Sequence, residues 1–258
     1  MSRRYDQSTT TFSPEGRLHQ VEYAIEAINN AGTCVGLLCD EGIVLTAERR
    51  VVSKLLAPSK TSEKTYTIDD HVVALVAGLA FDANILIHQS RLGSQRYLYK
   101  YQEPMPVEQM VKSVCNYKQA YTQYGGLRPF GTAFLFAGWD RNFGYQLYQT
   151  DPSGNYSGWK ATVIGQNNQA GKSILKTDYK PENTLEENLK VAVKILLKTM
   201  DSSTPSPERI ELSTLTKNDK GLLTHYTLSD AEVLKYIDLI QKELDEEQKK
   251  AEASTGDI

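Results

Sequence analysis

Apolar residues near the start of the chain recur at steps of three and four positions, which is the period of an amphipathic helix. Four residues set this spacing: Leu18, Val21, Ile25 and Ile28. The charged residues Glu22 and Glu26 lie between them, away from the apolar stripe. This pattern predicts a first helix over residues 17–30.

Beyond this helix, short β-like runs and longer helical stretches follow in blocks. Apolar runs bounded by turn formers predict strands over residues 34–39, 43–47, 65–68, 72–77, 132–137, 144–148, 160–164, 210–216 and 222–227. Helical spacing predicts a helix pair over residues 82–101 and 107–124, a second pair ending near residue 200, and a last helix over 229–244. Thr184 with Glu187, and Ser229 with Glu232, have the spacing of capping boxes at two helix starts.

The order of these elements decides the predicted fold class. Strands come in hairpins and helices come in pairs, which differs from the strand and helix alternation of a parallel sheet. Two antiparallel sheets packed face to face, with helices on both outer sides, bury every apolar face. We therefore predict an α+β fold with four layers in the order α-β-β-α, preceded by the extra N-terminal helix. One domain over residues 1–244 is expected, followed by a disordered charged tail over 245–258.

Composition and charge narrow the possible partners. The formal net charge is −3, and residues 242–258 by themselves carry the same charge, so the rest of the chain is close to neutral. Nucleic acids and membrane surfaces require clustered Lys and Arg residues, which this balance does not supply. The mean hydropathy is −0.44, and the polar residues 7–11 stand where a secretion signal needs an apolar run. Partners are expected to be proteins or peptides, with no nucleic acid and no membrane.

Three cysteines bear on the compartment. Cys34, Cys39 and Cys115 are odd in number and form no CxxC pair, so a disulfide scaffold or a metal knuckle is not indicated. We expect buried core thiols in a reducing compartment, and the chain is expected in the cytoplasm and nucleus.

One local motif resembles a phosphate-binding loop. Residues 165–173 read Gly-Gln-Asn-Asn-Gln-Ala-Gly-Lys-Ser, but five residues separate the two glycines where such a loop needs four, and a parallel βαβ context is missing. The four histidines are scattered without a metal-binding or catalytic spacing. We expect neither a cofactor nor a metal site, and a nucleotide-binding protein is kept only as an alternative.

Residues 13–24 carry a long and specific resemblance. They read Ser-Pro-Glu-Gly-Arg-Leu-His-Gln-Val-Glu-Tyr-Ala, which closely resembles the opening of α-type subunits of the 20S proteasome. The likeness continues through residues 42–50, 121–131 and 151–154 and covers about residues 2 to 245. Residues 2–6 and 154–161 look most like the third of the seven α positions. The resemblance implies a fold of the N-terminal-nucleophile-hydrolase type.

In catalytic relatives of this fold an N-terminal Thr supplies both a hydroxyl nucleophile and a free amine as the base. The matching position here is Gly32, which has no hydroxyl and whose nitrogen lies in an amide bond. Glu48 and Lys64 fall near positions used for catalysis in those relatives, but they cannot attack a peptide bond alone. The resemblance therefore implies a subunit without catalytic residues. The alternative is an active Thr hydrolase of the same fold, with Thr33 as nucleophile.

The resemblance also assigns gate residues, namely Tyr5, Asp6, Pro14 and Tyr23, with residues 1–12 as a gating tail. Two phenols and a carboxylate can form hydrogen bonds to neighbouring chains, while Pro14 fixes a turn. The alternative is a frayed terminus. Related chains often have Arg after Tyr-Asp, but this chain has Gln7, so a charge-assisted bond is replaced by a neutral one.

A second set of residues is expected to form a tail pocket between neighbouring α subunits. Lys64 matches the lysine that pairs with the C-terminal carboxylate of an activator, and Ala31 and Gly32 would form a small-residue wall. The alternative is an exposed lysine at a strand end. The expected function is thus a non-catalytic structural and gating subunit of the outer proteasome ring. Its expected partners are the other α subunits of a seven-membered ring, the β-ring subunits, and a regulatory particle or other activators.

Overall fold

The computed structural model describes residues 6–50, 55, 62–200, 206–218 and 220–255, with side chains at the C-terminal end described as far as residue 246. Two five-stranded sheets form its centre, and all neighbouring strands pair antiparallel. The first sheet has the order β10 (Leu223–Thr227), β9 (Ile210–Lys217), β2 (Gly42–Glu48), β1 (Cys34–Cys39) and β8 (Ala161–Ile164). The second has the order β3 (Thr65–Asp69), β4 (Val72–Gly78), β5 (Thr132–Asp140), β6 (Gly144–Thr150) and β7 (Tyr156–Gly158).

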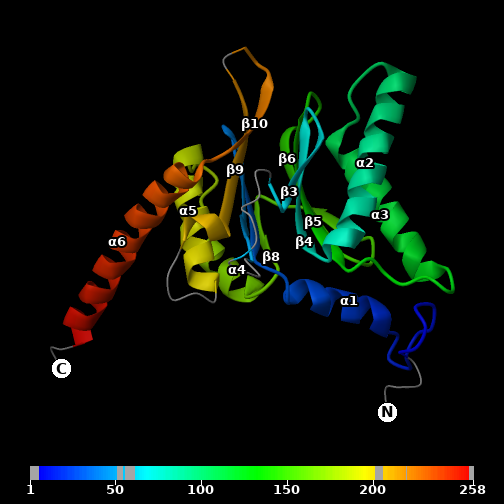
Figure 1. The fold of residues 1–258 in the computed structure, drawn as a ribbon, viewed down its shortest axis with the longest axis horizontal. Helices are drawn as coiled ribbons and strands as arrows, with labels where there is room; N and C mark the ends of the chain where they lie inside the picture. Colours follow the sequence, from blue (N-terminus) through cyan, green and yellow to red (C-terminus); the bar gives the residue numbers. More distant parts are fainter. Residues whose placement is uncertain (1–5, 51–54, 56–61, 201–205, 219, 256–258) are drawn as a thin grey trace.

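Helices cover both outer faces of this sheet pair, and Figure 1 shows the resulting layers side by side. The second sheet is covered by α2 (Ala80–Tyr101) and α3 (Val107–Gln123), and the first by α4 (Asn168–Asp178) and α5 (Leu185–Thr199). A 3-10 turn, η2 (Pro207–Arg209), precedes β9, and α6 (Asp230–Thr255) packs against α5. The four-layer α-β-β-α arrangement predicted from the sequence is confirmed.

Three clusters of buried apolar side chains hold the layers together. One lies between the two sheets and includes Leu45, Leu75 and Leu135. The other two lie outside the sheets, under α4 to α6 and under α2 and α3. Strands with both faces covered are apolar at nearly every position, and β2 is buried along its whole length. Such strands do not alternate between apolar and polar residues, which is typical of strands in the middle of a layered fold.

Local sequence signals account for most element boundaries. Thr184 and Glu187 form the predicted capping box at the start of α5. All three cysteines are buried free thiols, as expected. The short edge strand β7 was not predicted, because Tyr156–Gly158 is too brief to show a period. Residues 245–255, expected in a disordered tail, continue α6 as a helix, since they contain no glycine or proline.

The loop-like motif at residues 165–173 lies in an antiparallel setting. It joins β8, whose only pairing partner in the described part of the chain is β1, to the start of α4. Gly165 has a positive φ of 90° and packs against the backbone of Ala31 and Gly32. The glycine therefore serves a close approach of two backbones, and the βαβ context of a phosphate-binding loop is absent from the described strands.

A lysine of α3, Lys118, is fully buried. The Nζ atom of Lys118 donates to the carbonyl oxygen of Thr132 at 2.9 Å and to the Oγ1 atom of Thr150 at 3.1 Å. It also lies 5.5 Å from the centroid of the Phe134 ring. Burial lowers the pKa of Lys118 from 10.5 to about 8, because the charged ammonium loses its hydration.

The buried lysine gives a prediction about stability and pH. Since the unfolded chain binds this proton up to a higher pH than the folded chain, wild-type stability should rise between pH 8 and pH 10.5. The free energy of unfolding should gain up to about 3 kcal/mol over that window relative to Lys118→Met. Urea unfolding of the wild type and of Lys118→Met between pH 8 and pH 10.5 measures this difference. Tyrosines that titrate in this range contribute equally to both proteins, so their effect cancels in the difference. A difference that does not change with pH would show that Lys118 titrates normally.

Candidate functional site

The N-terminal helix α1 (His19–Asn29) lies across one end of the two sheets, as Figure 1 shows. It packs against β4 and β5, and its residue Ile28 is buried within the cluster between the sheets. Val21, about two turns earlier, is buried as well. The apolar stripe predicted for this helix thus anchors it over the end of the sandwich where β1 begins and β2 ends.

Gly32 lies directly behind this helix and is buried. Its carbonyl oxygen accepts a hydrogen bond from the Nζ atom of Lys64 at 3.1 Å. A Cβ atom at residue 32 would lie 2.8 Å from the carbonyl oxygen of Glu48 and 3.0 Å from Lys64 Nζ. There is consequently no space for a side chain at the position where a nucleophile is expected in catalytic relatives.

Thr33, the neighbouring hydroxyl residue, is also fully buried. Its Oγ1 atom donates to the carbonyl oxygen of Gln166 at 2.8 Å, and its N–H group donates to the carboxylate of Glu48 at 3.3 Å. The Glu48 carboxylate also pairs with Arg209 at 3.3 Å. The hydroxyl and the amide nitrogen of Thr33 are therefore both engaged in structural bonds.

A buried carboxylate positions the backbone at Lys64, directly before β3. The two oxygens of Glu211 accept hydrogen bonds from the backbone N–H groups of Glu63 at 3.0 Å, Lys64 at 3.4 Å and Thr65 at 2.9 Å. Arg49 pairs with the same carboxylate at 3.2 Å. Burial raises the pKa of Glu211, but its donors and Arg49 together outweigh that effect and hold the pKa below the usual value.

The three tail-pocket residues are close together in the structure. Lys64 is half-buried, and its ammonium group lies 3.8 Å from the Sγ atom of Cys34 as well as on the Gly32 carbonyl. The carbonyl oxygen of Ala31 accepts a hydrogen bond from Gln166 N at 2.8 Å. An incoming carboxylate would therefore meet a lysine that already holds the chain at the junction of α1 and β1.

Two of the expected gate residues contact each other within the chain. The hydroxyl group of Tyr23 donates to the Asp6 carboxylate at 3.3 Å, and Gln20 Nε2 donates to the carbonyl oxygen of Asp6. Tyr23 stays 47% exposed, so its outer side remains accessible. Tyr5, the other expected gate residue of this segment, lies outside the described residues.

The remaining gate residue, Pro14, is exposed and lies in a tight turn. Gly16 N donates to the Ser13 carbonyl oxygen at 2.9 Å, and Gly16 has a positive φ of 76°. Arg17 N donates to the Ser13 hydroxyl at 3.2 Å, which closes the turn from its other side. Proline at the second position and glycine at the fourth are typical of such turns. The turn reverses the chain just before α1, so that Asp6 can return to Gln20 and Tyr23 on that helix.

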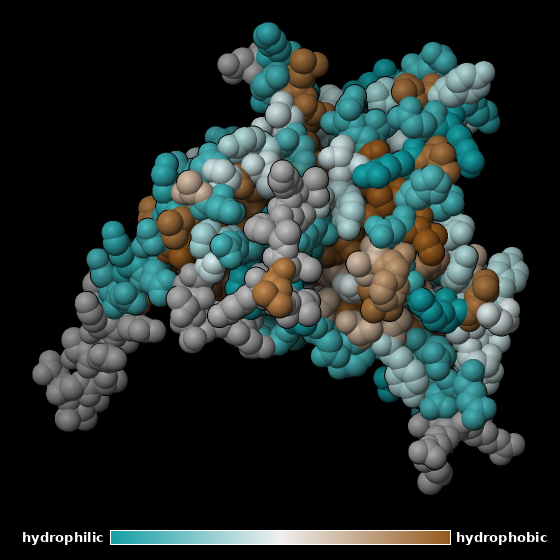
Figure 2. All heavy atoms as spheres, in the orientation of Figure 1, coloured by the Kyte–Doolittle hydropathy of each residue, from teal (hydrophilic) through white to brown (hydrophobic). Residues whose placement is uncertain are grey.

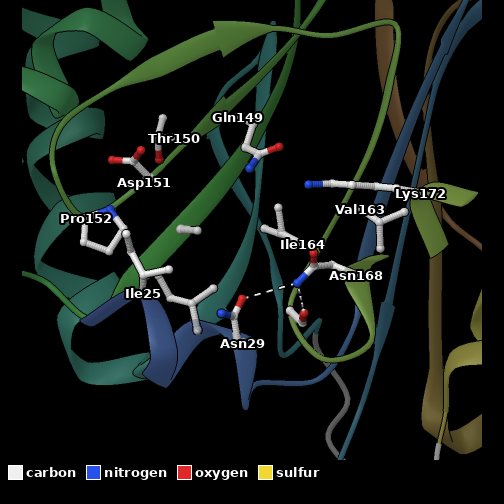
Figure 3. Close-up of a pocket in the computed structure, with 13 residues that line it drawn as sticks. Ile25, Asn29, Gln149, Thr150, Asp151, Pro152, Val163, Ile164, Asn168 and Lys172 are labelled. Atoms are coloured by element: carbon white, nitrogen blue, oxygen red, sulfur yellow. Dashed lines mark hydrogen bonds between the residues drawn. The ribbon is translucent and has the colours of Figure 1, made fainter. Parts of the chain in front are cut away.

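A cavity of about 240 Å³ borders the same end of the molecule. Figure 3 shows it between α1, the end of β6 with the two residues after it (Gln149–Pro152), and the β8 to α4 connection. The Nδ2 atom of Asn168 donates to Asn29 Oδ1 at 3.3 Å and to the Gly165 carbonyl oxygen at 2.8 Å, linking α4 to α1. Lys172 extends from α4 toward Gln149 across this space.

Comparisons with known proteins identify the family. Residues 28–215 match the family model described as proteasome subunit, and residues 5–27 match the N-terminal signature of A-type proteasome subunits. The chain belongs to the proteasome subunit family. The signature spans the described gate residues Asp6, Pro14 and Tyr23, and it ends where the match to the main family model begins.

Several relatives of this chain are α-type proteasome subunits. The alpha type-4 proteasome subunit of Spinacia oleracea is 62% identical over 213 residues, which cover 83% of this chain and 85% of the relative. The alpha type-4 proteasome subunit of Dictyostelium discoideum is 55% identical over 251 residues, covering 96% and 98%. Type 4 is another name for the third α position, so the resemblance noted at residues 2–6 and 154–161 is confirmed.

Sequence reasoning missed the charged residues that support the site. Glu211 and Arg209 are distant in sequence from Lys64 and Glu48. The pairing of β9 with β2 brings them beside Glu48, and the packing of the two sheets brings Glu211 to the backbone of Lys64. The one available signal was an acidic residue, Glu211, between two apolar strand positions. Within the described residues no group of three or more potential metal ligands occurs, and no helix is long and apolar enough to cross a membrane.

Proposed function

We propose that this proteasome subunit is a non-catalytic member of the outer α ring of the 20S particle. Its role there is structural, and its N-terminal segment controls the passage of substrates into the particle. This proposal includes the six other α positions of a seven-membered ring and the β-ring subunits as partners. A regulatory particle or another activator would dock on the outer face, and the assembly would serve ubiquitin-dependent protein degradation in the cytoplasm and nucleus.

The observation that carries this proposal is the occupied space around Gly32. A nucleophile at this position needs room for a hydroxyl-bearing side chain and a free amine. Backbone and ammonium atoms at 2.8 and 3.0 Å fill the space that such a side chain needs. The nitrogen of residue 32 is not a free amine, because α1 precedes it in the chain. The active Thr hydrolase is not favoured, since the hydroxyl of Thr33 is bonded to a backbone carbonyl.

The gating role is supported by the contact between Asp6 and Tyr23. It ties residue 6 to α1, which in turn is anchored between the sheets by Ile28. Of the expected gating tail over residues 1–12, residues 1–5 lie outside the described residues. A tail held at one point on a fixed helix can be aimed at a pore, and the exposed Tyr23 phenol can bond a neighbouring chain.

The tail pocket is supported by the grouping of Ala31, Gly32 and Lys64. A primary ammonium is a compact charge that suits a terminal carboxylate. Because Lys64 already donates to the Gly32 carbonyl at 3.1 Å, a bound carboxylate would share this ammonium, which has three hydrogens to donate. Docking would thereby be transmitted to the residue that joins α1 to β1.

Deleting residues 2–9 tests the gating role. In the assembled particle this deletion should raise basal hydrolysis of a fluorogenic peptide several-fold, because the barrier contributed by this tail is removed. The measurement compares hydrolysis by wild-type and variant particles at equal concentration. Deletion of residues 251–258, which are equal in number and at the other end of the chain, should leave the rate unchanged. An unchanged rate for both deletions would contradict a gating role for this tail.

A further inference from the structure

A large cavity lies at the end of the sandwich opposite α1. It has a volume of about 710 Å³ and is walled by the β3–β4 turn, the β5–β6 turn, the α2–α3 connection and the β9–β10 hairpin. These segments lie at the end of the sandwich far from Gly32 and Lys64. Cavities of this size can enclose a ligand of several hundred daltons or the side chains of a short peptide.

Apolar side chains form much of the wall. They come from all but one of the bordering segments: Pro104, Pro106, Trp139, Leu222 and Leu223. Leu222 is 63% exposed at the hairpin, and Figure 2 shows hydrophobic atoms at the tip of this hairpin. An exposed apolar side chain beside a cavity offers a contact surface that water does not stabilise. An occupant with an apolar side chain would gain by entering.

The charged residues that line the cavity are mostly acidic. Asp70, Glu103 and Asp140 oppose the single arginine, Arg141, which is paired with Glu103. Hydrogen bonds from Gln146 and from backbone N–H groups hold the pKa of the Asp140 carboxyl below its usual value despite burial, so it stays charged. Lys217, outside the lining, lies over the Trp139 ring with its Nζ atom at 3.2 Å from the centroid. With three carboxylates and one guanidinium, the lining itself carries a formal charge of −2.

His225 also lines the cavity. The Nε2 atom of His225 is buried and has no hydrogen-bond partner among the described residues. Burial lowers the pKa of His225, which keeps its imidazole neutral near pH 7. A neutral imidazole adds no charge, so the formal charge of the lining stays at −2.

We propose that this cavity binds a segment of a partner protein in which an aromatic or aliphatic side chain stands next to a Lys or Arg residue. The apolar side chain would lie against Trp139 and Leu222, and the cation would lie beside Asp70. Charge complementarity selects this occupant over an acidic or neutral segment, because the lining is acidic and apolar together. The site lies away from the gate residues and the tail pocket, so it is independent of the proposed gating role.

Trp139 provides a direct reporter of occupancy. The chain has two tryptophans, so the variant Trp159→Phe leaves Trp139 as the only one. The probe is the peptide acetyl-Lys-Phe-Leu-Lys-amide, which contains neither tryptophan nor tyrosine. Titrating it into the purified full chain should change the Trp139 emission in a saturable way. A peptide with Gln in place of both Lys residues should bind more weakly, and added salt should weaken the charged peptide.

Two pairs of variants distinguish binding of the peptide at this cavity from non-specific binding elsewhere on the protein surface. Asp70→Lys and Leu222→Ser should each weaken binding by at least about threefold, since one reverses the charge of the rim and the other removes an apolar contact. Asp238→Lys and Leu234→Ser make the same changes at exposed positions of α6 and should not alter it. Absence of a saturable change would overturn the proposal. Equal weakening by a variant and its α6 control, or equal binding of the Gln peptide, would overturn it as well.

Discussion

Replacing Glu211 with alanine is expected to lower the free energy of unfolding by about 3–5 kcal/mol, as removal of one partner from a buried ion pair does. The loss leaves the backbone N–H groups of residues 63–65 without their acceptor and Arg49 without its counter-ion. Urea unfolding at pH 7 measures it. The exposed Glu243→Ala should change stability by less than about 0.5 kcal/mol. A similar small change for Glu211→Ala would contradict the role assigned to this carboxylate.

The pH dependence of the same interaction follows from the lowered pKa of Glu211. A carboxyl whose folded pKa is below its unfolded value stabilises the fold above the unfolded pKa of 4.5. That contribution is lost as the pH falls through the lowered, folded pKa. The stability gap between wild type and Glu211→Gln should therefore narrow on acidification. A gap that stays constant from neutral to acidic pH would show that the charge of Glu211 has no part in it.

Replacing Gly32 with threonine is expected to destabilise the fold without creating a hydrolase. The new Cβ atom would lie 2.8 Å from a backbone oxygen, so the strands must shift, and overpacking of this kind costs about 1–3 kcal/mol. The introduced threonine would also have no free amine behind α1. The melting temperature and labelling by a threonine-directed warhead are the measurements.

Gly93 supplies the matched control for this substitution. It lies in α2, and a Cβ atom there would have no neighbour within 4 Å, so Gly93→Thr should cost little. Normal stability of Gly32→Thr combined with labelling at residue 32 would contradict the conclusion that this position has no space for a nucleophile.

The two ends of the sandwich differ in what fills them. At one end α1 and Lys64 close the space around Gly32, and at the other end turns and hairpin tips leave the cavity beside Trp139. The sheet pair is thus closed at the end that carries the proposed gate and open at the end where we propose that a partner segment binds. Because the ends are separated by the full length of the strands, variants at one end should leave the other unchanged.

Much of the fold could be predicted from periodicity. The helix over α1, the capping box of Thr184 and the apolar strands such as β2 have local signals. The missed β7 and the longer α6 show the limits of such signals. A three-residue edge strand is specified by its neighbour β6, and a charged stretch can continue a helix when nothing interrupts it.

The candidate site was predictable as a set of residues but not as a set of contacts. The resemblance named Asp6, Tyr23 and Lys64, and the structure adds that Asp6 bonds Tyr23 within the chain. It also adds that Lys64 faces the Gly32 carbonyl. The direction in which a side chain points is decided by tertiary packing, and a linear sequence motif carries no information about it.

The sequence by itself determined the element types, the pairing of helices and strands into layers, and the absence of a hydroxyl at residue 32, because these depend on local spacing and residue identity. Only the tertiary structure decided that no side chain fits at residue 32, that Glu211 holds the backbone at Lys64, and that His225 and Trp139 border one cavity. Each of those facts joins segments far apart in the chain. Their geometry follows from sheet pairing and close packing, which fix distances that sequence separation leaves open.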